Sequence, residues 1–265
     1  MAERLSGKIV LVTGGSSGIG KAAALLIAEE GATVVIAARN VERGNHAVQE
    51  IEQGGGSATF LPTDVSVPEQ VAKLIQETVH RYGRLDCALN NAAALGMLRR
   101  TADYDTSEFD AEVNANLRSV WLCMQAEIRQ MTKQNPCGGA IVNTSSVNGL
   151  GGARGAALYS MSKAGILALT KSAAQEYAAE GIRVNALVAG AFDTAMLQNA
   201  VSQSVGGDPE KIKAAFSGFT SQIPASRIGH PREAASAALW LLGDEASYVT
   251  GHSMIVDGGL TAWSR

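Results

Sequence analysis

The feature that most constrains this chain is the alternation of short apolar runs with longer segments of helical periodicity. Runs rich in β-branched residues predict strands at residues 9–12, 33–37, 58–61, 85–89, 140–144, 183–187 and 253–256. Between them, the periodicity predicts helices at residues 20–30, 41–53, 68–82, 107–131, 157–179 and 231–242. Such alternation is typical of parallel βαβ units, and near-continuous apolar strands suit a sheet covered on both faces. We therefore expect an α/β fold, a doubly wound parallel seven-stranded sheet with helices on both faces.

The 265 residues show no linker, repeat or change of composition that would divide them. We therefore expect a single domain over residues 1–265. Periodicity fades only between residues 191 and 228, where residues 202–209 are rich in serine and glycine. Because a long excursion at the carboxyl end of a strand is often a functional loop, this segment is a candidate substrate lid.

Charge and cysteine usage exclude several classes of protein. The formal net charge is −3 and no polybasic stretch occurs, which argues against nucleic acid or an anionic membrane as a partner. No run of about 18 apolar residues or signal-peptide core is present, so no membrane span is expected. The three cysteines are far apart and do not cluster with histidines, which argues against disulfides and metal sites and favours the cytoplasm: Cys87, Cys123 and Cys137.

A glycine-rich turn lies between the first predicted strand and the first predicted helix. Gly14 permits a tight turn, Gly18 lets a pyrophosphate approach the backbone, and Gly20 allows close packing of helix on strand. The free N–H groups and the dipole of the following helix would face the phosphates. The spacing is Gly-x-x-x-Gly-x-Gly rather than Gly-x-Gly-x-x-Gly, and an ordinary glycine-rich turn is the alternative. In this context the turn predicts a Rossmann-type dinucleotide site.

A tyrosine and a lysine lie one helical turn apart at positions 159 and 163. A phenol titrates near 10, and an ammonium group one turn away is expected to lower the pKa of Tyr159 toward that of a useful acid/base. Ser145 and Ser146 follow at the carboxyl end of a predicted strand, where parallel sheets bind ligands. A solvent-exposed helix face and simple capping of the strand end are the alternatives.

Taken in order, these motifs resemble those of the short-chain dehydrogenase/reductase family over residues 7–259. The motifs that carry the resemblance are Thr13-Gly14-x-x-x-Gly18-Ile19-Gly20, Asp64-Val65, Asn90-Asn91-Ala92, Asn116-Leu117, Ser146, Tyr159-x-x-x-Lys163, Arg183-Val184-Asn185, Gly190 with Thr194, and Val256-Asp257-Gly258-Gly259. Several ordered motifs are far more specific than any one of them.

The resemblance implies a catalytic tetrad. Tyr159 matches the general acid/base, and Lys163 matches the residue that lowers its pKa and binds the nicotinamide ribose. Ser146 lies 13 positions before Tyr159, at the family spacing, and would bind and polarise the substrate oxygen. On that spacing Ser145 is interpreted as structural.

Asn116 matches the fourth member of the tetrad, in a bent helix that holds a water between the lysine and solvent. Asn114 is the rival position, but it lacks the following leucine that Leu117 supplies. Two departures from the family pattern, Ala93 for glycine and Ala189 for proline, affect positioning but remove no reacting group.

The resemblance implies hydride transfer between a nicotinamide dinucleotide and a small alcohol or ketone. One alternative is a 3-oxoacyl-[acyl-carrier-protein] reductase, but residues 133–137 lack the arginines that an acidic carrier protein would favour. A non-catalytic nucleotide-sensing protein is the remote alternative, and the filled tetrad argues against it.

The resemblance also implies which residues contact the dinucleotide: Gly14, Ser16, Ser17, Gly18, Ile19, Gly20, Arg39, Asp64, Val65, Asn91, Ala92, Tyr159, Lys163, Phe192 and Thr194. NADP(H) is favoured over NAD(H), because Ala38 fills the acidic position that binds an unphosphorylated ribose and Arg39 can hold a phosphate. Ser16 and Asn40 are expected as further donors. Ser17 occupies a position that is basic in some NADP-binding members, so only one cation is expected.

The substrate pocket is expected between residues 94–98, 148–158 and 191–220. Its predicted lining is mainly apolar, with two possible polar contacts: Leu95, Leu98, Leu150, Leu158, Met196 and Leu197, then Asn148 and Arg154. The helices at 107–131 and 157–179 carry more apolar residues than one buried face needs, at Val120, Trp121, Met124, Leu169, Ala173 and Tyr177. With the resemblance, this predicts a homotetramer, in which the end of the chain at Trp263 forms a second interface.

Overall fold

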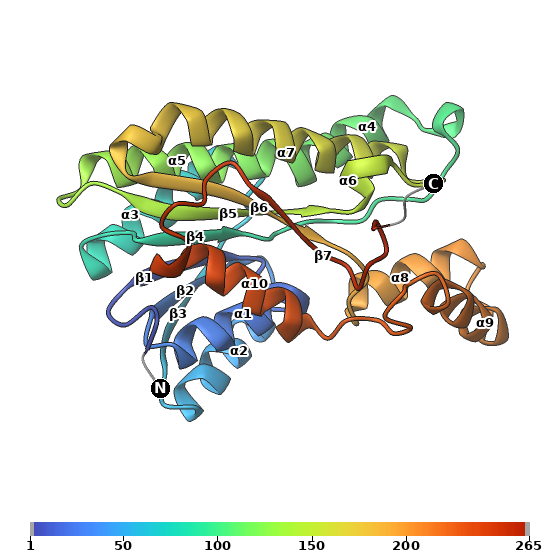
Figure 1. The fold of residues 1–265 in the computed structure, drawn as a ribbon, viewed down its shortest axis with the longest axis horizontal. Helices are drawn as coiled ribbons and strands as arrows, with labels where there is room; N and C mark the ends of the chain where they lie inside the picture. The colour runs from blue at the N-terminus through green and yellow to red at the C-terminus, as the bar shows by residue number, and fades with distance from the viewer. Residues whose placement is uncertain (1–2, 263–265) are drawn as a thin grey trace.

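Seven strands form one parallel sheet in the computed structural model, which describes residues 3–262 (Figure 1). The strand order is β3-β2-β1-β4-β5-β6-β7, so the chain winds outward in both directions from β1. The strands are β1 (Ile9–Thr13), β2 (Thr33–Ala38), β3 (Ser57–Pro62), β4 (Cys87–Asn90), β5 (Gly139–Ser146), β6 (Ile182–Ala189) and β7 (Ser253–Val256). The predicted doubly wound seven-stranded fold is confirmed.

Helices cover both faces of the sheet (Figure 1). One face packs against α1 (Gly18–Glu29), α2 (Val41–Gln53) and α10 (Pro231–Leu242). The other packs against α3 (Pro68–Tyr82), α5 (Ser119–Lys133) and α7 (Ala157–Tyr177). Shorter elements complete the chain: η1 (Thr101–Asp103), α4 (Thr106–Val113), η2 (Asn114–Arg118), α6 (Asn148–Gly151), η3 (Ala178–Glu180), α8 (Ala195–Ser204), α9 (Pro209–Thr220) and η4 (Asp244–Ala246).

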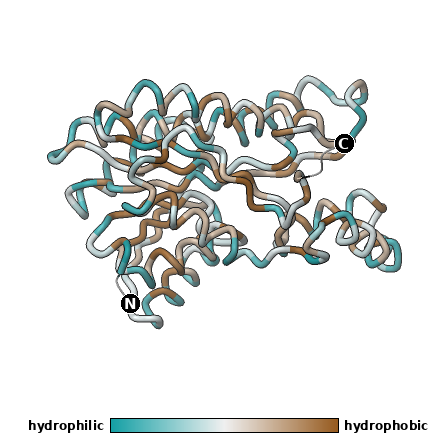
Figure 2. Tube along the Cα trace, viewed as in Figure 1, coloured by the Kyte–Doolittle hydropathy of each residue, from teal (hydrophilic) through white to brown (hydrophobic). Residues whose placement is uncertain are grey.

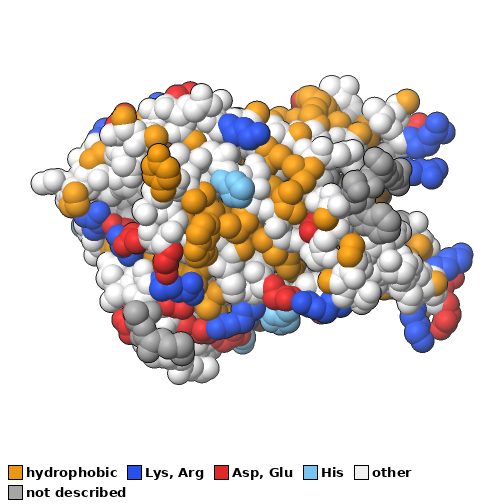
Figure 3. Space-filling view, in the orientation of Figure 1, with side chains coloured by type: hydrophobic (Ala, Val, Ile, Leu, Met, Phe, Trp, Pro, Cys, Tyr) orange, Lys and Arg blue, Asp and Glu red, His pale blue; other side chains and the backbone are white. Residues whose placement is uncertain are grey.

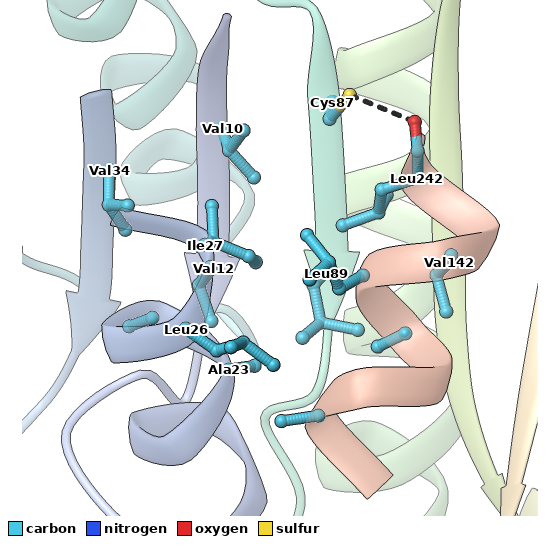
Figure 4. Close-up of a cluster of buried hydrophobic side chains, with 14 of the residues drawn as sticks. Val10, Val12, Ala23, Leu26, Ile27, Val34, Cys87, Leu89, Val142 and Leu242 are labelled. Carbon is cyan, nitrogen blue, oxygen red and sulfur yellow. Dashed lines mark hydrogen bonds between the residues drawn. The ribbon is translucent and has the colours of Figure 1, made fainter. Parts of the chain in front are cut away.

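The core consists of two apolar layers, one on each face of the sheet. Alternate strand residues point to opposite layers, as Val10 and Leu11 do. Figure 4 shows the layer under α1 and α10, where the Cys87 Sγ lies 3.7 Å from the Leu242 carbonyl oxygen. The most hydrophobic stretches of the chain follow the central strands (Figure 2). This packing holds the strand ends, and with them the site, in fixed positions.

Local signals explain several of the element boundaries. Pro68 occupies the first turn of α3, and the left-handed Gly83 (φ 81°) ends that helix. The Asn40 side chain caps α2 by accepting a hydrogen bond from the Arg43 N–H at 2.8 Å. The bounds predicted for α2, α3, α10 and β7 agree with the structure.

The helix predicted over residues 107–131 is present but irregular, because its helical backbone runs from Thr106 to Lys133 with a π-helical segment in the middle. The structure has α4, then one wide π-helical segment (η2), then α5. Asp105 and Glu108 form a capping box, in which Glu108 accepts the N–H of Asp105 at 2.9 Å, and α4 therefore begins at Thr106, one residue earlier than predicted. The π-helical turn arises where Asn116 is bound to the loop after β4, which is a tertiary contact that periodicity does not contain.

The segment at residues 191–228 is more regular than its sequence suggested. Thr194 caps α8, and Asp208 with Pro209 begins α9, so the serine- and glycine-rich stretch is only the end of one helix and a turn. The two helices extend beyond the carboxyl ends of the strands (Figure 1). Among residues 3–262, no helix is long and apolar enough to cross a membrane.

The expected surplus of apolar helix surface is only partly present. Trp121 is exposed on α5. The other five residues are wholly or partly buried within the chain itself: Val120, Met124, Leu169, Ala173 and Tyr177. Trp263, expected at a second interface, lies outside the described residues.

Candidate active site

One large cleft lies along the carboxyl ends of the strands and measures about 1150 Å³. Its walls come from the ends of β1, β2, β4, β5 and β6, together with α7 and α8. It brings together nearly every residue predicted to bind the dinucleotide or to react, and only Gly20 and Asn116 do not line it. Segments far apart in sequence therefore meet at the sheet edge where parallel strands bind ligands.

The glycine-rich turn forms one end of the cleft. Gly14 has φ 66°, and a Cβ there would lie 2.9 Å from the Ala92 Cα. Gly18 has φ 54°, and a Cβ there would lie 3.2 Å from the Thr194 Cγ2. Gly20 is buried, and its Cβ would lie 2.4 Å from the Gly14 carbonyl oxygen. Gly20 thus packs α1 against the turn, as predicted, rather than facing a ligand.

The N-terminus of α1 is available to an anion. Ser17 is the N-cap residue, but its side chain makes no capping hydrogen bond. The first turn carries no acidic side chain. The backbone N–H groups and the positive end of the helix dipole therefore face the cleft without a competing carboxylate, as pyrophosphate binding requires.

A buried hydroxyl connects β1 to the loop after β4. The Thr13 Oγ1 accepts hydrogen bonds from the N–H groups of Asn91 and Ala92, at 3.0 and 3.1 Å. These hydrogen bonds hold Asn91 and Ala92, two residues predicted to bind the dinucleotide, against the glycine-rich turn. Sequence reasoning noted Thr13 only as part of a motif, and nothing local showed that its side chain would cross to another strand.

The far end of the cleft carries two arginines. Arg39 is exposed just after β2, and Arg43 lies in the first turn of α2. A second guanidinium group therefore lines this end of the cleft, where one cation was expected, and the fold rather than a helical spacing brings the two together. Asn40 lines the cleft, and its Oδ1 caps α2 by accepting the Arg43 N–H, which leaves the Nδ2 as the donor that the sequence predicted. Asp64 accepts hydrogen bonds from the N–H and hydroxyl of Ser66, which, with Arg39 nearby, hold the pKa of its carboxyl low.

The predicted reacting groups meet in the middle of the cleft. Ser146 ends β5, and its Oγ accepts the Asn148 N–H at 3.2 Å. Ser145 donates instead to the buried Lys163 carbonyl oxygen at 2.8 Å, which agrees with a structural interpretation. The Lys163 Nζ donates to the Thr144 carbonyl oxygen at 2.9 Å and lies 5.5 Å from the centre of the Tyr159 ring.

Burial dominates the electrostatics of this pair. It raises the pKa of Tyr159 to about 12, against the lowering effect of the Ser146 hydroxyl. It also lowers the pKa of Lys163 to about 8. The expectation that Lys163 lowers the Tyr159 pKa is therefore not met in the protein alone, because desolvation penalises both charged forms.

Asn116 lies behind the cleft and is wholly buried in η2. Its Oδ1 accepts the Ala94 N–H at 2.9 Å, while its Nδ2 donates to the Ala94 carbonyl oxygen at 2.8 Å and to the Glu112 Oε1 at 2.6 Å. The rival Asn114 does line the cleft, and its side chain accepts from Arg118 at 2.8 Å. Helix irregularity at Asn116 agrees with the bend that the sequence predicted.

The part of the cleft predicted to hold the substrate is mainly apolar. Four of the predicted residues line it together with Phe219, which sequence reasoning did not single out: Leu95, Leu98, Met196 and Leu197. Leu150 and Leu158 do not line it, and Leu150 lies exposed on α6. Asn148 and Arg154, the two predicted polar contacts, do line it. Within the described residues, no cluster of three or more histidines, cysteines or acidic residues could hold a metal.

Comparisons with known proteins agree with this geometry. The family model described as Enoyl-(Acyl carrier protein) reductase matches residues 14–261. The 3beta-hydroxysteroid dehydrogenase of Mediterraneibacter gnavus is 37% identical, over 98% of this chain and 97% of that protein. The 3-oxoacyl-[acyl-carrier-protein] reductase FabG of Thermotoga maritima is 39% identical, over 97% of this chain and 99% of that protein. The crystal structure of levodione reductase has a TM-score of 0.94 at 34% identity, covering 98% of this chain and 100% of that one.

Proposed function

The chain belongs to the short-chain dehydrogenase/reductase family and is an oxidoreductase acting on alcohol or carbonyl groups, and we propose that Tyr159 is its general acid/base. A nicotinamide dinucleotide, when bound along the cleft, supplies or accepts the hydride. The cradle at Gly14 and Gly18 and the uncapped N-terminus of α1 support its binding there.

Each reacting group has a distinct role. In carbonyl reduction, the Ser146 hydroxyl donates to the carbonyl oxygen and polarises it, and the Tyr159 Oη then gives its proton to that oxygen. In alcohol oxidation the same proton returns to Tyr159. The Lys163 ammonium stabilises the phenolate form and binds ribose hydroxyls, and Asn116 completes the tetrad from behind the cleft.

The observation that carries this proposal is the meeting of Ser146, Tyr159 and Lys163 in one cleft that continues to the N-terminus of α1. We expect Tyr159→Phe to reduce turnover by roughly 10²-fold or more, while dinucleotide binding, measured by NADPH fluorescence, stays nearly unchanged. Tyr248→Phe makes the same change at an exposed position and serves as the control. If Tyr159→Phe retains more than a few per cent of turnover, the assignment fails.

The cleft supports NADP(H) over NAD(H). Ala38 supplies no carboxylate to repel a 2′-phosphate, and Arg39 and Arg43 are two guanidinium groups at the same end. Steady-state kinetics with both cofactors test this, and a higher kcat/KM with NAD(H) would contradict it. Ala38→Asp should turn the preference toward NAD(H), because a carboxylate there accepts from ribose hydroxyls and repels phosphate.

The apolar lining favours a free, small alcohol or ketone with a hydrocarbon ring or chain. The alternative is that the protein is a 3-oxoacyl-[acyl-carrier-protein] reductase, which the similarity to the Thermotoga maritima enzyme favours. A panel that contains cyclic secondary alcohols, a hydroxysteroid and a 3-oxoacyl thioester separates them. Efficient turnover of the thioester alone would overturn the preferred substrate class. The segment at residues 191–228 would close over this end as a lid.

Exposed apolar residues support a homotetramer. Phe109, Trp121 and Met161 are exposed on α4, α5 and α7, and Ile255 is exposed on the edge strand β7. Figure 3 shows hydrophobic side chains gathered on the face that carries β7 and α10. Light scattering at micromolar concentration should give four times the chain mass, and a monomeric mass would refute the assembly. The three cysteines are all free, which supports a reducing cytoplasm.

A further inference from the structure

Glu112 is a buried carboxyl that the mechanism above does not use. It lies at the end of α4, immediately before the π-helical turn, and its exposed fraction is 7%. A carboxyl group in such a place is costly unless its surroundings satisfy it. No signal in the sequence analysis singled it out.

Both carboxylate oxygens of Glu112 have specific neighbours. The Oε1 accepts the Asn116 Nδ2 at 2.6 Å, a short, charge-assisted contact. The Oε2 faces the backbone of Gly96, where an added Cβ would lie only 2.5 Å away. Glu112 therefore holds together the buried Asn116 amide and the loop that carries Ala94, and this loop lines the cleft.

Helix α4, which carries Glu112, packs against α7, which carries the reacting pair. The charge of Glu112 raises the pKa of both Tyr159 and Lys163, against the lowering that burial causes at Lys163. Burial raises the pKa of Glu112 itself, while the contact with Asn116 lowers it. The loop over residues 91–98 and the helix α6 carry no ionisable side chain, and Arg118 of η2 donates to Asn114. The titratable groups on which the charge of Glu112 acts are Tyr159 and Lys163 of α7.

We propose that Glu112 is a positioning residue of the active site, which fixes the Asn116 amide and the loop at residues 94–96 and sets the charge behind Tyr159 and Lys163. The inference rests on the proposed roles of those two residues. A purely structural role would affect stability alone, whereas this role also makes the pH dependence of catalysis depend on the charge at position 112.

The decisive variant is Glu112→Gln, measured in the oxidation direction with saturating dinucleotide and the fastest secondary alcohol of the panel. Alcohol oxidation needs Tyr159 ionised, and removal of a neighbouring negative charge eases that ionisation. The rising limb of log(kcat/KM) should therefore move to lower pH, by about half a unit or more. A glutamine has one acceptor oxygen where glutamate has two, so it keeps only one of the contacts with Asn116 and Gly96. We therefore expect kcat to fall, while the dinucleotide KM stays within about threefold of the wild-type value.

Two further variants separate charge from position. Glu112→Asp keeps the charge but withdraws it by one carbon, so kcat should fall roughly fivefold while the pH limb stays near that of the wild type. Asp110→Asn removes a negative charge from the exposed side of the same helix and should change neither quantity.

An unmoved pH limb in Glu112→Gln overturns the inference. If Glu112→Gln does not fold, Glu112→Asp decides, and a kcat within twofold of the wild type overturns it. Tyr159→Phe is measured beside them. Should it retain turnover, the proposed role of Tyr159 fails; should it be inactive while Glu112→Gln matches the wild type, only the role of Glu112 fails.

Discussion

Glu127 makes the stability of this protein depend on pH in an unusual direction. It is fully buried in α5, where its Oε2 accepts the Asn90 Nδ2 at 2.9 Å. Within the part of the chain that the structure describes, its Oε1 has no hydrogen-bond partner. Burial raises the pKa of Glu127 from the ordinary 4.5 to about 8. The folded protein therefore keeps this carboxyl neutral at pH 7, whereas the unfolded chain ionises it.

The sign and size follow from proton linkage. Between the two pKa values the folded state binds one more proton than the unfolded state, so the free energy of unfolding falls as pH rises. Below pH 4.5 this loss of unfolding free energy is absent, and above pH 8 it is fully present. Each pH unit in the window corresponds to about 1.4 kcal/mol, so a rise from about pH 5 to about pH 7.5 should cost roughly 3 kcal/mol.

Glu127→Gln isolates this contribution, because a glutamine fills the same space and cannot ionise. Urea unfolding of both proteins at the two pH values gives the difference in unfolding free energy, with the protein concentration fixed because assembly affects apparent stability. The wild type should lose roughly 3 kcal/mol relative to the variant over this range. A difference that stays constant within about 0.5 kcal/mol would show that the buried carboxyl has an ordinary pKa.

Other changes test the construction of the site. Thr13→Val should lower the unfolding free energy by roughly 2–4 kcal/mol, measured by urea unfolding, because the N–H groups of Asn91 and Ala92 lose their acceptor. The same variant should raise the dinucleotide KM, and an unchanged KM would contradict this. Gly20→Ala should cost roughly 1–3 kcal/mol in the same assay, because its Cβ would lie 2.4 Å from a backbone oxygen, and a fully stable variant would be the contrary result. Lys163→Ala should weaken NADPH binding and lower kcat by roughly 10²-fold, and loss of only one of the two would remove one of its proposed roles.

The sequence predicted those parts of the fold that have a local cause. Pro68 and Gly83 mark the start and the end of α3 in the sequence itself, and the apolar runs identified all seven strands. Glycine spacing and strand ends also placed the dinucleotide turn and the Tyr159–Lys163 pair in one region. The cleft brings these residues together, while their individual roles remain predictions.

What the sequence missed has a tertiary cause. The π-helical turn at Asn116 depends on a loop more than 20 positions earlier, so helical periodicity could not show it. The pKa of Tyr159 depends on burial more than on the lysine one turn away, and spacing reports only the lysine. Glu112 pairs locally with Asn116, but its burial and its contact with Gly96 depend on another segment, which the sequence does not show. Arg43 was missed because Arg39 lies before α2, so that only the fold brings the two arginines to one end of the cleft.

Substitutions in the two halves of the cleft should differ in how much they lower the free energy of unfolding. The dinucleotide half is built from strand ends whose neighbours form the core, whereas α9 buries none of its residues and α8 buries only Val201. Substitutions in these two helices therefore carry little penalty for the sheet. If α8 and α9 cover the substrate as proposed, substitutions within residues 195–220 should change the substrate range and leave the structure of the glycine-rich turn intact.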